Sequence, residues 1–227
     1  MRPPLEQAFV TGFGAELIYS FVIIVCSLMV YFETKKIYEL SSHKGIKYFR
    51  QAFLFFAIAY FFRSLIKFIL VFFNIRTISE FSPILFGPIT LFIFIYFSSM
   101  AVFYLLYSVM WKRWNGNSKM IYLFHAIAIV ISIISISSRR NEVLFGINIL
   151  LFILISFIVY IAYKDSKTKK KRNNLYVIYM LLFAFWILNI IDILIPFFLE
   201  KFRLLIYLAS SGIFLAILYR VLKRSGN

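Results

Sequence analysis

Among the side chains that carry a charge or a carboxamide within stretches that are mostly apolar, five stand out: Glu16, Arg63, Lys67, Asn189 and Asp192. A charged group near the centre of a bilayer costs about 2.5–3.5 kcal/mol, so each of them needs a partner, a wet cavity or a ligand. Arg63 and Lys67 are four residues apart, and Asn189 and Asp192 are three apart, so each pair shares one face of a helix. These side chains are the candidates for ion pairing or ligand binding.

The charged members of this set lie at related depths. Counted from the nearer end of their stretches, Glu16, Lys67 and Asp192 are about six or seven residues in, which is roughly 10 Å of helix. Arg63 is about eleven residues in and therefore deeper. Two acids and two bases at such depths can neutralise one another, whereas an unpaired charge would be far more costly. We therefore predict that all five side chains form one polar cluster in the outer half of a helical bundle.

The cluster has three interpretations, which the sequence leaves open. It can bind a small ligand or an ion, or it can be a structural network of ion pairs. Lys67 can also extend its ammonium group to the outer headgroups. In the first case the pocket would be lined by Tyr60, on the same helical stripe as Arg63, and by Ser210 and Ser211, midway along the last apolar stretch.

Seven apolar stretches must position these side chains. Apolar residues make up 63% of the 227, more than a soluble domain of this size can bury. Each stretch is long enough to cross the ~30 Å hydrocarbon core as a helix. The sequence thus predicts an all-α, multi-pass integral membrane protein with one seven-helix transmembrane domain over residues 1–227. The predicted spans are 10–33, 48–73, 83–110, 119–138, 142–163, 175–198 and 202–222.

The third stretch contains a helix breaker. Gly87–Pro88 is expected to interrupt a helix that starts at Pro83, because the residue before a proline is disfavoured in the helical conformation. This pattern predicts that 88–110 spans the membrane and that 76–87 is irregular.

The basic residues predict the orientation of the chain. Alternate connecting segments and termini carry 17 basic residues on one side and 6 on the other, and the remaining 2 of the 25 are Arg63 and Lys67. By the positive-inside rule this bias places the N-terminus outside and the C-terminus in the cytoplasm, most simply in the cell membrane. The basic cytoplasmic loops would attract anionic lipid headgroups or a cytoplasmic protein partner. Because the net charge of +16 is spread over short loops beside apolar spans, it argues against nucleic acid as a partner.

A weak internal similarity suggests a repeat. Placing the third stretch on the seventh aligns Ser98–Ser99 with Ser210–Ser211, and placing the second on the sixth aligns Lys67 with Asp192. These matches favour two parallel three-helix units joined by the fourth span, as in some carriers. The seven-span layout with the N-terminus outside is similar to that of microbial opsins, G-protein-coupled receptors and SWEET-type sugar carriers. The similarity covers topology only, since no motif of those families is present.

No residue pattern in the sequence identifies a catalysed reaction. Two histidines and one cysteine cannot supply a typical zinc site, and the chain has no nucleophile elbow and no glycine-rich phosphate loop. We therefore expect no catalytic residues, no metal site and no cofactor. The sequence favours a receptor-like or sensor-like bundle whose polar cluster binds a small ligand. The alternatives are a small-solute transporter built from two three-helix repeats and a structural membrane subunit or scaffold.

Overall fold

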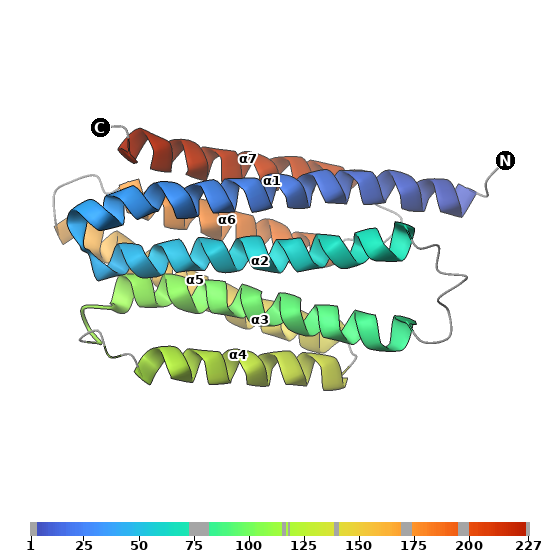
Figure 1. Ribbon diagram of the computed structural model, residues 1–227, viewed down its shortest axis with the longest axis horizontal. Helices are drawn as coiled ribbons and strands as arrows, with labels where there is room; N and C mark the ends of the chain where they lie inside the picture. The colour runs from blue at the N-terminus through green and yellow to red at the C-terminus, as the bar shows by residue number, and fades with distance from the viewer. Residues whose placement is uncertain are drawn as a thin grey trace.

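The computed structural model describes residues 4–72, 82–114, 117, 119–138, 141–168, 174–194 and 200–225, and every regular element in these residues is an α-helix (Figure 1). Side chains are described for a smaller set: 14–65, 68, 88–114, 117, 119–138, 142–167, 175–192, 194 and 202–223. The helices are α1 (Pro4–Ser41), α2 (Lys44–Phe72), α3 (Ser82–Met110), α4 (Lys119–Ser138), α5 (Asn141–Thr168), α6 (Asn174–Leu194) and α7 (Glu200–Ser225).

Six of these helices contain an apolar segment long enough to cross a membrane, so the chain is a helical, multi-pass integral membrane protein. The described side chains of α2, 44–65 and 68, contain no such segment. The six segments are Gly14–Ser41, Pro88–Met110, Lys119–Ser138, Glu142–Lys167, Leu175–Asp192 and Phe202–Lys223.

The helices run roughly side by side along the long axis of the molecule, and successive helices point in opposite directions (Figure 1). Within the described residues, six of them form a closed ring of neighbours in the order α1, α2, α3, α5, α6 and α7, with α7 returning to α1. Helix α4 lies outside this ring and packs against α3 and α5. We call the end at which α1, α3, α5 and α7 finish the basic end, and the other the opposite end.

Helix α2 is held in the ring by a buried stripe. Ala52, Phe53, Phe56, Ala59 and Tyr60 are all at most 3% exposed, and their spacing of one, four, seven and eight residues places them on one face. Inside a membrane the association of helices depends on close van der Waals packing rather than on the hydrophobic effect. The buried alanines let the backbone of α2 approach its neighbours, while the aromatic rings fill the centre of the ring.

The centre of the ring is an aromatic cluster contributed by α2, α6 and α7. The rings of Phe185 and Phe214 meet edge to face with centroids 4.8 Å apart, and Phe56 lies 6.2 Å from Phe214 and 6.3 Å from Trp186. Such edge-to-face contacts are the favoured geometry for aromatic pairs. This cluster separates the basic end from the polar side chains at the opposite end.

Each predicted span overlaps one helix of the described residues, and the two differ at most of their ends. The fourth prediction, 119–138, coincides with α4, whereas α1 continues to Ser41 because its basic residues extend the helix instead of forming a loop. The turn that follows uses Ser42, whose φ of 50° is the left-handed conformation that ends a helix.

The predicted break at Gly87–Pro88 is wrong, because α3 begins at Ser82 and continues through Pro88. Pro88 is the seventh residue of the helix, beyond the first turn, so it removes one backbone hydrogen bond, to the carbonyl of residue 84, without ending the helix. The described side chains of this helix, from Pro88 to Met110, form an apolar segment long enough to span a membrane. Residues 76–81 lie outside the described residues.

Candidate functional site

An ion pair joins α1 to α2 near the opposite end of the bundle. The Nη2 atom of Arg63 lies 2.9 Å from Oε1 of Glu16, and Nε donates to the same oxygen at 3.2 Å. The two side chains are only 21% and 13% exposed. The guanidinium also lies 5.4 Å from the ring centroid of Phe94 on α3, a distance at which a cation is attracted to an aromatic face.

A chain of three polar side chains crosses the ring from α1 to α6. The hydroxyl of Tyr60 donates to Oδ1 of Asn189 at 3.3 Å and lies 3.1 Å from the hydroxyl of Tyr19. Asn189 in turn donates to the backbone carbonyl of Phe185 at 2.9 Å. These contacts satisfy buried polar groups that would otherwise cost about 1–3 kcal/mol each.

A second ion pair joins α6 to α7. Nε of Arg203 lies 3.6 Å from Oδ1 of Asp192, and the side chains are 30% and 17% exposed. Asp192 lies two residues before the end of α6 and Arg203 is the fourth residue of α7, so this pair lies where the two helices end and begin at the opposite end of the bundle.

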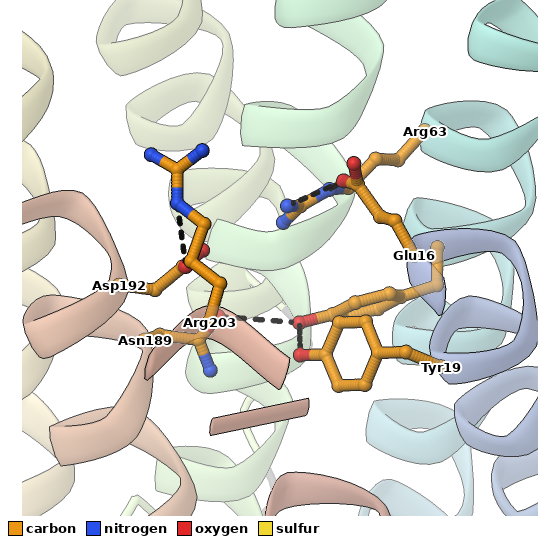
Figure 2. A network of polar contacts seen from close by, with 7 residues as sticks. Glu16, Tyr19, Arg63, Asn189, Asp192 and Arg203 are labelled. Atoms are coloured by element: carbon orange, nitrogen blue, oxygen red, sulfur yellow. Dashed lines mark hydrogen bonds and ion pairs between the residues drawn. The ribbon is translucent and has the colours of Figure 1, made fainter. Parts of the chain in front are cut away.

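Figure 2 shows the two ion pairs on opposite sides of this end of the bundle, with Tyr19 and Asn189 below them in the view. We call Glu16, Arg63, Asp192 and Arg203 the charged layer. Its formal charges cancel, which makes its burial tolerable. The ring of Tyr207 on α7 stacks on that of Tyr19 with centroids 4.7 Å apart, so α1 and α7 are also linked beside it.

A small cavity lies about one helical turn below the charged layer. It has a volume of about 40 Å³ and is enclosed by α2, α3, α5 and α6. One water needs about 10–15 Å³ measured in this way, so the space holds two or three waters or one very small solute. Its lining is uncharged and mixes aromatic rings with hydroxyl and amide groups. The lining residues are Phe56, Tyr60, Phe94, Ile95, Ser98, Ile147, Asn148, Leu151, Phe185, Trp186 and Asn189.

Four of the five residues predicted to cluster lie near one another at one end of the bundle, namely Glu16, Arg63, Asn189 and Asp192 (Figure 2). The side chain of Lys67 lies outside the described residues. Arg203 was not predicted to belong to the cluster, because it follows a loop at the start of an apolar stretch and was counted among the loop charges. Nothing in the sequence distinguishes Tyr19 and Tyr207 from the other tyrosines, of which the chain has 15 in all.

Of the three residues predicted to line a pocket, Tyr60 lines this cavity, whereas Ser210 and Ser211 do not. The reason is the ring order: α7 packs against α1 and α6, whereas the cavity is enclosed by the four helices on the other side. Ser210 is fully buried, and its hydroxyl has no hydrogen-bond partner in the described part of the chain. Among those same residues, no group of three or more histidine, cysteine, aspartate or glutamate side chains lies close enough to hold a metal ion.

A protein of Archaeoglobus fulgidus, described as an uncharacterized protein, is 30% identical to this chain over 225 residues, which are 98% of this chain and 95% of that protein. The two chains belong to one family. No family model matches the chain, and no solved structure matches it.

Removing one hydroxyl tests the polar chain across the ring. Tyr60→Phe is expected to lower the free energy of unfolding by about 0.5–1.5 kcal/mol, because the carboxamide of Asn189 and the hydroxyl of Tyr19 both lose a partner. The measurement is thermal denaturation of the purified protein in detergent. The matched control is Tyr122→Phe, at a tyrosine that is 76% exposed on α4. Equal melting temperatures for the two variants would show that the contacts of Tyr60 contribute nothing.

Proposed function

We propose that this chain is a receptor-like membrane protein in which all seven helices cross the bilayer. Helix α2 is included because its buried stripe places it between α1 and α3 in the ring, where it has the same direction as the other even-numbered helices. The alternation of basic loops then puts the N-terminus outside and the basic end in the cytoplasm. In this orientation the charged layer and the cavity both lie in the outer half.

The observation that carries the receptor-like function is that an uncharged polar cavity lies directly beneath two ion pairs. Arg63 is three residues from Tyr60, and Asp192 is three residues from Asn189, so each charged residue sits one turn from a cavity residue on its own helix. A small polar solute that enters from outside meets the charged layer first. Replacing one of its ion-pair contacts would shift α1 against α2, or α6 against α7, and the continuous helices would carry the shift to the basic end.

The cavity lining defines the class of ligand. Its polar groups are amides and hydroxyls, and its other walls are aromatic rings, so it suits a small uncharged solute with both polar and apolar atoms. The cationic and anionic groups of the charged layer already neutralise each other. We propose binding rather than catalysis, because the groups around the cavity include no nucleophile with an adjacent base.

Trp186 offers a built-in reporter for this proposal. The chain has three tryptophans, and Trp186 lines the cavity while Trp111 and Trp114 lie at the basic end. In a Trp111→Phe/Trp114→Phe protein, small uncharged amides, alcohols and polyols are titrated while Trp186 emission is recorded. At least one is expected to give a saturable change. Ser98→Leu, which fills the cavity, should abolish it, whereas Ser64→Leu on α2, outside the lining, should not. A response that survives Ser98→Leu, or no saturable response, would contradict the proposal.

A transporter is the second candidate, and the order of the helices around the ring supports it. Under a two-fold operation that exchanges α1, α2 and α3 with α5, α6 and α7, the neighbour pairs α1–α2, α2–α3 and α3–α5 become α5–α6, α6–α7 and α7–α1, all of which occur. Helix α4 lies outside the ring, where a linker between two parallel units would lie. Proteoliposomes that contain this chain alone separate the candidates: a transporter moves the solute that changes Trp186 emission, and a receptor does not. A scaffold would neither bind nor move it.

A further inference from the structure

A groove on the surface of the bundle runs between α5 and α6 at the basic end. It has a volume of about 280 Å³, and its lining mixes aromatic and aliphatic side chains. Ser156 and Tyr163 mark its extent along α5, and seven residues of helix correspond to about 10 Å. The lining residues are Ser156, Val159, Tyr160 and Tyr163 on α5 and Tyr176 and Phe183 on α6.

The end of this groove is capped by positive charge. Tyr160, Tyr163, Lys164 and Lys167 are spaced by three, four and seven residues, so they follow one stripe of α5. The ammonium group of Lys167 lies 4.7 Å from the ring centroid of Tyr163, which in turn lies 5.6 Å from the ring of Tyr176 across the groove. Asp165 directly follows Lys164 in the sequence, so it lies on another face of the helix.

We infer that this groove is a binding site for one anionic phospholipid. Its acyl chain lies along the apolar part of the groove, from Tyr163 towards Ser156, and its phosphate and anionic headgroup lie at the level of Lys164 and Lys167. The charge complementarity decides the class of ligand: an ammonium pair above an apolar groove at the membrane interface fits a phosphate carried on hydrocarbon. The tyrosines suit the same boundary, because their rings are apolar and their hydroxyls reach the headgroups.

A protein segment fits the groove less well than a lipid. The groove opens onto the membrane-facing surface of α5, where Tyr160 is 61% exposed, so lipid is the molecule that already surrounds it. A zwitterionic phospholipid carries the same phosphate but cancels its charge with an amine. The site should therefore discriminate by headgroup charge and not by chain length. The inference is independent of the ligand role proposed for the charged layer, which lies at the opposite end.

Native mass spectrometry of the full chain in detergent tests the site. Phosphatidylglycerol is expected to bind with 1:1 stoichiometry and roughly tenfold more tightly than phosphatidylcholine with the same chains. The double variant Lys164→Gln/Lys167→Gln should lose most of that preference. The matched control is Lys44→Gln/Lys47→Gln, which removes two exposed lysines with the same spacing from the basic end of α2. An equal loss of preference in both variants would overturn the site in favour of general attraction to the basic end.

Two further measurements distinguish a seated lipid from a bound anion. Val159→Phe, which fills the groove and leaves both lysines in place, should weaken phosphatidylglycerol binding. Glycerol phosphate, which has the anionic group without the chains, should not compete. If glycerol phosphate displaces the lipid, or if Val159→Phe leaves binding unchanged, the groove is not a lipid site.

Discussion

Arg63→Gln is expected to destabilise the folded protein by about 3–5 kcal/mol, because it leaves the buried carboxylate of Glu16 without its cation. The cost comes from the buried carboxylate that has lost this cation and not from the ion pair itself. Restoring neutrality should therefore recover most of the loss, and Glu16→Gln/Arg63→Gln is expected to be more stable than Arg63→Gln. Unfolding in mixed detergent micelles, measured for both single variants and the double variant, gives the coupling energy.

Lys36→Gln is the matched control for this cycle. Its partner is Glu33, at 3.3 Å on α1, but the lysine side chain is 68% exposed. An exposed pair contributes about 0–1 kcal/mol, so this variant should hardly change the free energy of unfolding. If Arg63→Gln lowers the free energy of unfolding no more than Lys36→Gln does, the charged layer is as well solvated as the surface. The ion pair then does not hold α1 to α2.

The cycle also separates a structural role from a binding role. A purely structural pair can be replaced by a neutral pair, and the double variant should then still give the ligand-dependent change in Trp186 emission. If the charged layer takes part in binding, the double variant should fold and lose that response. Stability and binding are thus measured in the same double variant, so a structural role and a binding role of the charged layer can be told apart.

The helices were predictable from the sequence because the bilayer imposes one simple requirement. A spanning segment must satisfy its own backbone hydrogen bonds and present apolar side chains, so hydrophobic length alone locates α4 to the residue and the others to within several residues at most ends. The end of α1 and the break expected at Gly87–Pro88 were harder. Both depend on how a helix continues beyond its apolar segment, where amphipathic and charged residues can extend it.

Three charged residues of the charged layer were singled out by the sequence, but their pairing was not. The cost of a charge in an apolar stretch singled out Glu16, Arg63 and Asp192. Which of them meet depends on the order of helices around the ring and on their rotation, and neither is encoded in hydropathy. Arg203 illustrates the difficulty, because a basic residue at the start of a span has the same sequence pattern whether it faces headgroups or a neighbouring aspartate.

Phe56→Ala is expected to lower the free energy of unfolding by about 3–5 kcal/mol, through the void that it opens in the aromatic cluster. Phe56 is 1% exposed and contacts Phe185, Trp186 and Phe214, so neighbouring rings cannot close the space without losing their edge-to-face geometry. Because unfolding within a membrane leaves apolar groups in lipid, this loss reflects packing and not the hydrophobic effect. Unfolding in mixed micelles measures it.

Phe61→Ala provides the comparison on the same helix. Phe61 is 48% exposed on the outer face of α2, where lipid or detergent can fill the space left by its ring. The variant should therefore cost far less than Phe56→Ala. Because Phe56 also lines the cavity beside Trp186, Phe56→Ala should enlarge it and admit more water, which shifts Trp186 emission to longer wavelength in the Trp111→Phe/Trp114→Phe protein. Equal losses of stability, or an unshifted spectrum, would mean that the ring interior is not packed around this aromatic cluster.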